Sequence, residues 1–506
     1  MECFNNQSIE DPKALLSLVQ SQHQTLLHQS ERIEELESQL AWFKRQIFGQ
    51  KSERYVNPNQ VDMFADLLTK EEPLPEEKTE QITTVRRKPK RNPLPKTLAR
   101  ERIELDVQEK DKACPCCKEP RRRIGETITE ELAFQPAKFW VREYIRAKYA
   151  CPHCEEGGVV TAPAPVRPIP KGIFGHEVLA HLLVSKYEDH LPLHRQLKIF
   201  RRQNIELSES TVNDGVLQSA QLLAPLTDVL KTQLLCAERI FTDDTPVTLK
   251  SNAPNESHQS RLWVYIRQGE EDPPVTLFHF TENRSRAGPQ NILGEFEGFL
   301  QADAYGGYDA LYATQRIVEV GCWSHARRYF DRAGKLHKKS SRAHEALGYI
   351  RKLFMIERDI KTLSHQQRFW IRRQRALPVL RAFKTWLDQQ HIDVSTKTKF
   401  GIAVTYTLNQ WEALVEYVNH GLLEISNDTA ERAIRPIAVG RKNWMYFGSP
   451  RGGHAAAVIF SLMATCKQNS VNPFDWLVYV LKKLPTTNAS DYPSLLPFHF
   501  KDKFPL

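Results

Sequence analysis

The chain has 506 residues, of which 41% are hydrophobic, so it is long enough for several globular domains with substantial cores. No apolar run approaches the ~18 residues that span a bilayer, and the first residues lack the core of a signal peptide. We therefore expect a cytoplasmic protein without a membrane segment. The formal net charge of +9 is moderate, and nine cysteines in such a chain do not describe a disulfide framework.

The first fifty residues carry an apolar repeat of seven. Such a seam buries itself against a second helix, so residues 13–50 are predicted to form a coiled-coil dimerisation helix. An amphipathic helix packed on its own chain is the alternative. The repeating positions are Val19, Leu26, Ile33, Leu40 and Ile47.

Residues 51–97 lose this repeat and gain proline and charge, which is typical of a linker. A basic block follows an acidic stretch, with seven Lys or Arg between residues 86 and 100. This block either attracts phosphates or is simply a solvated linker.

Two cysteine pairs have the spacing of zinc ligands. Each C-x-x-C pair can place two thiolates on one tetrahedral Zn²⁺, and β-rich sequence between the pairs allows a hairpin to bring them together. We expect a structural zinc module over residues 98–160. Its candidate ligands are Cys114, Cys117, Cys151 and Cys154, with Cys116 and His153 as substitutes.

Residues 171–235 are predicted to be helical, after a proline-rich spacer. Pro192 is expected to begin a basic helix, and Ser208 to cap the next one. Two helices joined by a short turn are compatible with a helix-turn-helix DNA reader. A plain helical hairpin fits equally well.

From residue 236 the sequence changes to short β-rich segments. Asp243 closes the first predicted strand, where Pro246 is expected to stop the ladder, and Asp303 closes the fourth. Mixed α/β topology with carboxylates at strand ends is what a ribonuclease-H-like fold requires. The predicted strands span residues 240–242, 262–267, 275–280, 299–302 and 317–322.

Residues 331–420 are almost wholly helical and basic, and we interpret them as an insertion into this core fold. Their charge suggests a surface that faces DNA. The basic residues concerned are Arg372, Arg373, Arg375, Arg381 and Lys384.

Glu431 is expected in a helix that Ser426 or Asn427 caps, and that Pro436 ends or kinks. A spacing of four puts Asn427 and Glu431 on one face, so an amide and a carboxylate point together. Glu431 alone would more often be a surface ion-pair partner, but basic neighbours favour a phosphate-bearing ligand. The acids predicted to form a divalent-metal site for cutting and joining nucleic acid are Asp243, Asp303 and Glu431.

Several long motifs together resemble the transposases of the insertion sequence 66 family, nearly end to end. The chain departs from the usual family sequence at Asp244, where the family has Glu, and at Asp428, where it has Asn. Neither position belongs to the acidic triad that the resemblance implies. The motifs span residues 46–49, 169–172, 185–193, 301–312, 322–328, 430–436 and 440–444.

The resemblance implies a bacterial, nucleoid-associated DNA transposase that cuts and joins the ends of its own insertion sequence. Asp243 would bridge two Mg²⁺ or Mn²⁺ ions, while Asp303 and Glu431 would each hold one, by analogy with the fold. The expected partners are transposon-end DNA, target DNA, a second copy bound through the coiled coil, and accessory proteins of the same element. A catalytically inactive DNA-binding protein that synapses ends, and a ribonuclease-H-like nuclease that cuts without joining, are the alternatives.

Cys322 and His325 form a C-x-x-H motif after the fifth predicted strand. We favour a structural role for His325 near the metal site, or a contact with DNA, over zinc ligation. A zinc site would need two further ligands, for which His337 and His344 are the only nearby candidates in the sequence. Asp244, Asp309 and Asp428 are interpreted as turn or capping residues. Asn427 joins Cys322 and His325 as an auxiliary residue, and the candidate DNA-binding residues are Arg327, Arg328, Arg435, Arg441 and Lys442.

The predicted architecture is therefore multidomain α+β. A ribonuclease-H-like catalytic core is split around the helical insertion, and a helical segment closes the chain. In order, the predicted parts are a coiled coil (13–50), a linker (51–97), a zinc module (98–160), a helical DNA-binding region (171–235), the core (236–330 and 421–455), the insertion (331–420) and the C-terminal segment (456–506).

Overall fold

The computed structural model describes residues 139–150, 159–250, 257–269, 272–335 and 341–503. The described residues before 165 belong to a smaller compact unit, and those from 165 onward belong to a larger one. The smaller unit contains the antiparallel strands β1 (Lys148–Ala150) and β2 (Val159–Thr161). The predicted coiled coil and linker lie outside the described residues. So do the four zinc-ligand candidates Cys114, Cys117, Cys151 and Cys154.

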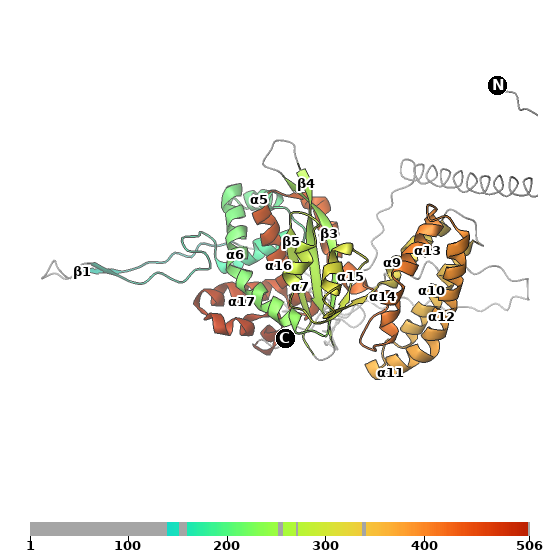
Figure 1. Ribbon diagram of the computed structural model, residues 1–506. Coiled ribbons are helices and arrows are strands. Elements are labelled where there is room, and N and C mark those ends of the chain that lie inside the picture. The colour runs from blue at the N-terminus through green and yellow to red at the C-terminus, as the bar shows by residue number, and fades with distance from the viewer. Residues whose placement is uncertain (1–138, 151–158, 251–256, 270–271, 336–340, 504–506) are drawn as a thin grey trace, which may run out of the picture. The chain divides into compact units, whose positions relative to one another are not determined.

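The larger unit is built on a six-stranded sheet with the order β5-β4-β3-β6-β7, in which β8 (Tyr446–Phe447) also pairs with β3 (Figure 1). β3 (Arg239–Lys250), β4 (Ser257–Arg267) and β5 (Val275–Thr281) form an antiparallel meander. β6 (Gly298–Gln301) and β7 (Ile317–Val320) run parallel to β3. This confirms the mixed α/β prediction and the positions of the five predicted strands.

The prediction that Pro246 stops the first strand is wrong, because β3 continues to Lys250 and pairs with β4 along its whole length. The Pro246 carbonyl accepts a hydrogen bond from Arg441 Nη1 at 2.6 Å, so it faces away from β4. In a strand the nitrogen and carbonyl of one residue point to the same side, so the proline lacks its N–H where the β4 ladder does not need one. Asp243 is consequently a mid-strand residue.

Gly298 begins β6 with φ +144°, a conformation that side chains disfavour. A Cβ at this position would lie 2.5 Å from the Glu238 carbonyl oxygen. Glycine therefore allows β6 to start directly beside β3, which brings the carboxyl end of β6 next to the centre of the sheet.

Three helices precede the sheet: α4 (His176–Tyr187), α5 (Leu193–Arg201) and α6 (Glu209–Leu235). The predicted cap is confirmed, since the Ser208 hydroxyl accepts a hydrogen bond from Thr211 N at 3.1 Å. α5 buries Leu197 and Phe200 and exposes its basic residues, as an amphipathic helix does. α6 packs against β5 and α16 (Pro450–Gln468).

The outer edge of β5 is covered by hydroxyl side chains of α16. Ser461 Oγ accepts a hydrogen bond from Phe278 N at 2.8 Å, and Thr465 Oγ1 accepts one from Thr276 N at 3.2 Å. These bonds satisfy edge N–H groups that would otherwise be open to pairing with another strand.

The helices after β7 share a core of their own (Figure 1). Trp323, Phe383 and Leu380 are buried in it, together with Val404 and Tyr417. The elements are α9 (Trp323–Gly334), α10 (Arg342–Asp359), α11 (His365–Ile371), the π-helical turn η3 (Arg372–Ala376), α12 (Leu377–Asp393), α13 (Lys399–Asn409), α14 (Trp411–Val415) and η4 (Glu416–Val418).

The prediction that Arg372 belongs to a DNA-facing surface is wrong, because this side chain is fully buried. It forms an ion pair with Glu357 and donates hydrogen bonds to three backbone carbonyls. Arg373, Arg375 and Arg381 are exposed. The basic sequence of this region therefore combines a structural arginine with solvent-facing ones.

The helix that carries Glu431 is α15 (Asp428–Trp444), which continues through Pro436. None of the helices in the described part of the chain has the length and apolar character that crossing a bilayer requires. The remaining elements are α7 (Ala287–Leu293), η2 (Gly306–Tyr308), α8 (Asp309–Tyr312), α17 (Pro473–Lys483), η5 (Leu484–Thr486), η6 (Ala489–Leu495) and α18 (Pro497–Lys503).

Candidate active site

Asp243 lies on β3, at the centre of the sheet. Its carboxylate accepts a hydrogen bond from the backbone N–H of Asp244 at 2.8 Å, and the side chain is half-buried. Burial, followed by the like charge of Asp303, raises the pKa of Asp243 to about 7, and Glu431 contributes in the same direction. The groups around Asp243 therefore supply too little positive charge to stabilise the ionised form of its carboxylate.

Asp303 follows β6 at the carboxyl end of this strand, as the sequence predicted. Its Oδ2 lies 3.5 Å from Arg284 Nη2, whereas Oδ1 is buried and has no hydrogen-bond partner among the described residues. Burial raises the pKa of Asp303, and the charges of His325 and Arg284 oppose this rise. A bound cation would satisfy the unpartnered oxygen, which is costly to bury alone.

Glu431 projects from the first turn of α15. Arg328 Nη2 donates to both of its carboxylate oxygens, at 3.1 Å each, and His325 Nε2 lies 3.7 Å from Oε1. The three acids thus come from three separate elements, and the charges of two of them act on the third. The structure therefore brings Asp303 and Glu431 close enough to Asp243 for their charges to raise its pKa.

The start of α15 is fastened to the strands that carry the other two acids. Asn427 Nδ2 donates to the backbone carbonyl of Thr242 at 2.8 Å, next to Asp243. Gln301 Nε2, two residues before Asp303, donates to the carbonyl of Glu424 and, at 3.3 Å, to that of Ser426. These bonds set the position from which Glu431 reaches the site.

Asn427 occupies the N-cap position of α15, but its side chain makes no capping bond. The prediction that the side chain of Ser426 or Asn427 caps this helix is therefore wrong, because the Asn427 Nδ2 group is bound to β3. Its Oδ1 is buried and lacks a partner within the described residues.

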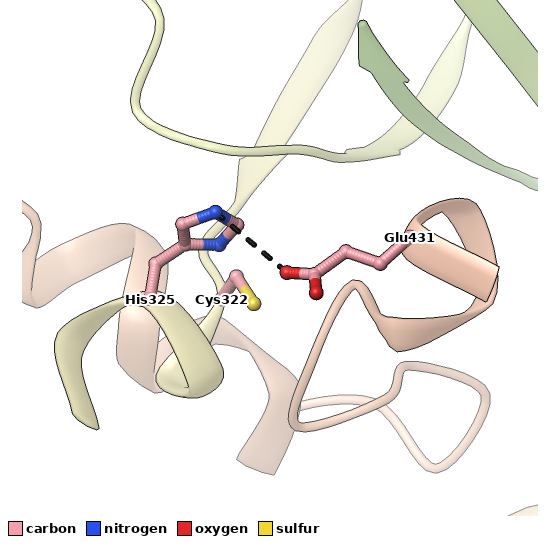
Figure 2. A group of neighbouring side chains, drawn as sticks. All are labelled: Cys322, His325 and Glu431. Carbon is pink, nitrogen blue, oxygen red and sulfur yellow. Dashed lines mark ion pairs between the residues drawn. The ribbon is translucent and has the colours of Figure 1, made fainter. Parts of the chain in front are cut away.

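Cys322, His325 and Glu431 form a cluster in which one ligand atom of each lies within 4.8 Å of the others. Figure 2 shows the side chains of Cys322 and His325 directed toward Glu431, with the ion pair between His325 and Glu431 marked. Cys322 Sγ also accepts a hydrogen bond from Asn427 N at 3.1 Å. Burial raises the pKa of the Cys322 thiol to about 12, so it is protonated at neutral pH. The same three groups could ligate a metal ion that displaces this proton.

The histidine of this cluster, His325, feels the charges of two of the acids, Glu431 and Asp303. Burial and the charge of Arg328 lower the pKa of His325, whereas Glu431 and Asp303 oppose that shift. His325 Nδ1 is buried and has no hydrogen-bond partner in the described ranges. The net effect of these groups is a pKa of His325 below the ordinary value of a histidine.

The five candidate DNA-binding residues fall into different environments. Arg328 is bound to Glu431, and Arg441 Nη1 donates to Thr245 Oγ1 at 2.9 Å and to Pro246 O, which fastens α15 to β3. Arg435 and Lys442 are exposed on α15, and Arg327 is half-buried on α9.

Asp244 and Arg284 are site residues that the sequence analysis missed. Asp244 was interpreted as a turn or capping residue, but it lies mid-strand with a side chain only 2% exposed. Arg261 Nη1 donates to its Oδ2 at 2.9 Å, and Arg284 Nη2 donates to its Oδ1 at 2.7 Å. Two adjacent acids inside one strand are the only signal that the sequence offers, since Arg284 belongs to no motif that we identified.

Four family models match the chain. The model described as "Transposase IS66 family" matches residues 171–455, and "IS66 C-terminal element" matches residues 461–498. The model described as "zinc-finger binding domain of transposase IS66" matches residues 111–155, and "Transposase C of IS166 homeodomain" matches residues 35–103. Leucine-zipper and zinc-finger domains thus belong to the architecture of this chain.

Relatives in Sinorhizobium fredii (strain NBRC 101917 / NGR234) extend over most of the chain. Uncharacterized protein y4hP is 31% identical over 92% of this chain and 88% of its own length. Uncharacterized protein y4jD is 32% identical over 93% of this chain and 96% of its own length. The matches cover the sheet, the three acids and the flanking modules together, and the chain belongs to the IS66 family of transposases.

Proposed function

We propose that this protein is a DNA transposase that cleaves the ends of its own insertion sequence and joins them to target DNA, with Asp243, Asp303 and Glu431 as its catalytic acids. The observation that carries the proposal is the convergence of the three carboxylates from β3, the end of β6 and the first turn of α15, whose positions are linked by hydrogen bonds of Asn427 and Gln301. Burial and the charges of the other two acids accordingly raise the pKa of Asp243. Like-charged carboxylates are gathered at one place at a cost to folding, which favours a function for them there.

The strand order supports a ribonuclease-H-like core. An antiparallel meander of three strands, followed by two strands parallel to the first, puts Asp243 on the first strand and Asp303 directly after the fourth. In α/β sheets, ligands bind at the carboxyl ends of parallel strands, and Asp303 occupies such an end.

The residues present fit divalent metal ions of the Mg²⁺ or Mn²⁺ class. Carboxylate oxygens are the ligands that such hard cations prefer, and the buried Oδ1 of Asp303 lacks a partner in the described chain. In the proposed assignment Asp243, Asp303 and Glu431 would together hold two such ions. When bound, the ions would stabilise the negative charge that develops on the attacking and leaving oxygens.

Residues around the acids have separate proposed roles. Arg328 orients Glu431 through bonds to both carboxylate oxygens, and Arg441 and Asn427 keep α15 against β3. Exposed Arg435 and Lys442 would contact DNA phosphates, which attract Lys and Arg irrespective of sequence.

The flanking modules have proposed partners of their own. The four cysteines Cys114, Cys117, Cys151 and Cys154 fall within or at the edge of the segment matched by the zinc-finger family model, which supports structural Zn²⁺ at these positions. The N-terminal repeat supports self-association through a coiled coil. Accessory proteins of the same element are a further proposed requirement.

The test is an incubation of the full-length protein with labelled end DNA, a target plasmid and Mg²⁺. Joined products would support the proposal. Cut but unjoined DNA would favour a nuclease, and DNA that is bound but intact would favour an end-synapsing protein. Because accessory proteins are part of the proposal, the incubation is repeated with the other proteins of the element.

A further inference from the structure

Arg284 is held beside Asp303 by two independent contacts. It lies in the loop between β5 and α7, and both Nε and Nη2 donate to Asp244 Oδ1, at 3.0 and 2.7 Å. Its guanidinium carbon lies 4.0 Å from the centre of the Tyr305 ring, and the Tyr305 hydroxyl donates to the Arg284 carbonyl at 2.7 Å. A guanidinium fixed by a carboxylate and a stacked ring has little freedom to turn away.

The charge of Arg284 exceeds what its ion pair with Asp244 requires. Asp244 is already paired with Arg261, so one buried carboxylate faces two guanidinium groups. The remaining positive charge lies 3.5 Å from Asp303 Oδ2. A pair built only to neutralise Asp244 would be complete with Arg261 alone.

One side of the Arg284 guanidinium is available to a ligand. The side chain is 35% exposed, and Nη1 makes no hydrogen bond to any residue that the structure describes. Nη1 is therefore an available donor on a group whose Nη2 lies 3.5 Å from Asp303 Oδ2, and the two bonds to Asp244 already orient this group. Guanidinium groups are frequent donors to phosphate oxygens.

We propose that Arg284 binds a non-bridging oxygen of the DNA phosphate that reacts beside Asp303. Asp244 and Tyr305 act as positioning residues for it. The inference rests on the proposed transposase function and adds a substrate-contacting cation to it. In a phosphodiester reaction the extra negative charge develops on these non-bridging oxygens, where a fixed guanidinium stabilises it without reorganising.

The experiment couples a change in the protein to a change in the DNA. End duplexes are prepared with one neutral methylphosphonate at each position across the boundary of the element, and the full-length chain is titrated with each duplex in the absence of divalent ions. Arg284→Gln is compared with the wild type. Arg286→Gln, which removes an exposed arginine from the same loop, is the matched control.

We expect Arg284→Gln to weaken binding of ordinary end DNA by roughly 10- to 100-fold, the effect of losing a hydrogen bond to a charged group. With the methylphosphonate at the reacting position, the same variant should weaken binding by less than about 2-fold. Arg284→Lys should restore part of the affinity, since it keeps the charge and loses the fork. Any loss of affinity that Arg286→Gln causes should be the same for DNA with the methylphosphonate as for ordinary DNA.

A purely structural Arg284 would weaken binding of both kinds of DNA equally, or of neither, and either outcome overturns the inference. Thermal melting of each variant identifies a loss of fold. Cleavage in Mg²⁺ is measured separately. If the wild type never cuts end DNA and the coupling is still present, the proposed function fails and the phosphate contact stands. If the wild type cuts and no coupling is found, only the role of Arg284 fails.

Discussion

Two clusters of buried charge in the larger unit are built in opposite ways. In the helices after β7, Arg372 is fully buried, and its five N–H groups match five hydrogen bonds to Glu357 and to the carbonyls of Tyr417, His420 and Leu423. Here the chain supplies every hydrogen-bond partner that the buried Arg372 guanidinium needs.

The sheet cluster is left unbalanced. Burial, followed by like charge, raises the pKa of Asp243 and of Asp303, and one oxygen of Asp303 has no partner among the described residues. A buried charge that has all its partners commonly serves the fold, whereas buried carboxylates with too little countercharge are typical of ligand or catalytic sites. We infer that the Arg372 cluster stabilises the fold and that the Asp243 and Asp303 cluster binds a ligand.

The largest expected effect is on activity. Asp303→Asn should lower the rate of end cleavage by roughly 1,000-fold or more, because bound metal supplies several kcal/mol of charge stabilisation and about 1.4 kcal/mol corresponds to tenfold in rate. The folded state should not lose stability, since the change removes like-charge repulsion. Single-turnover cleavage and thermal melting measure the two effects.

Asp309→Asn is the matched control, because Asp309 is an exposed acid six residues further along the same segment. It should keep the wild-type rate. An Asp303→Asn variant that joined ends normally would remove Asp303 from the catalytic assignment.

The opposite behaviour is expected in the balanced cluster. Arg372→Leu should lower the free energy of unfolding by about 3–5 kcal/mol, because it leaves Glu357 buried without its partner. Urea unfolding of the full chain measures this loss. Arg373→Leu, at an exposed neighbouring position, should change stability by less than about 0.5 kcal/mol.

Removing both charges tests whether the pair or the isolated charge matters. The double variant Arg372→Met with Glu357→Leu should recover part of the lost stability, but not all, since three carbonyls that Arg372 serves would remain without donors. A double variant as unstable as the single one would mean that the carbonyl bonds, rather than Glu357, dominate.

The pH dependence of stability should separate the two clusters in the metal-free protein. The pKa of Asp243 rises from 3.8 to about 7 on folding, so the folded state binds the proton more tightly than the unfolded state does. The stabilising contribution of this proton is present below pH 4 and is lost as the pH rises from about 4 to about 7.

Asp243→Asn should therefore gain stability relative to the wild type across that pH range, by up to about 1.4 kcal/mol for each unit of pKa shift. Mg²⁺ should reduce this difference in the free energy of unfolding by stabilising the wild type at pH 7. Urea unfolding of both proteins at several pH values measures the difference. A difference independent of pH would mean that Asp243 has an ordinary pKa.

The sequence predicted the five strands because each is a short β-rich run bounded by loops. It also predicted Asp303 at a strand end and Ser208 as a cap, since these depend on a few adjacent residues. It failed for the extent of β3, because Asp243, Asp244 and Pro246 are poor strand formers in isolation. Their conformation is held by partners far along the chain, such as Arg441 on α15.

The same limit applies to the charges. Nothing in a single sequence distinguishes buried Arg372 from exposed Arg373, because burial depends on which helices meet. Arg284 reaches Asp244 across 40 residues through a long side chain, a contact with no periodicity to reveal it. The acids themselves were predicted from their local sequence context and from the family motifs, whereas Arg284 beside them required the fold.

The smallest effect on the cleavage rate is expected for the hydrogen bond that holds the start of α15 to Cys322. Cys322→Ala removes the sulfur that accepts the Asn427 N–H, and leaves that buried N–H without a partner at a cost of about 1–3 kcal/mol. Because Asn427 begins the helix that carries Glu431, we expect the cleavage rate at saturating DNA to fall by about 10-fold, as a misplaced catalytic group costs rate. The DNA concentration at half-maximal rate should change little.

Cys466→Ala provides the comparison, since Cys466 is also a fully buried cysteine but lies in α16, which carries none of the three acids. It should lose stability and keep the cleavage rate. Equal rate losses in the two variants would show that α15 tolerates the missing bond, and that Cys322 matters to the fold alone. A loss confined to Cys322→Ala would tie the position of Glu431 to a thiol that touches neither DNA nor metal in the proposed assignment.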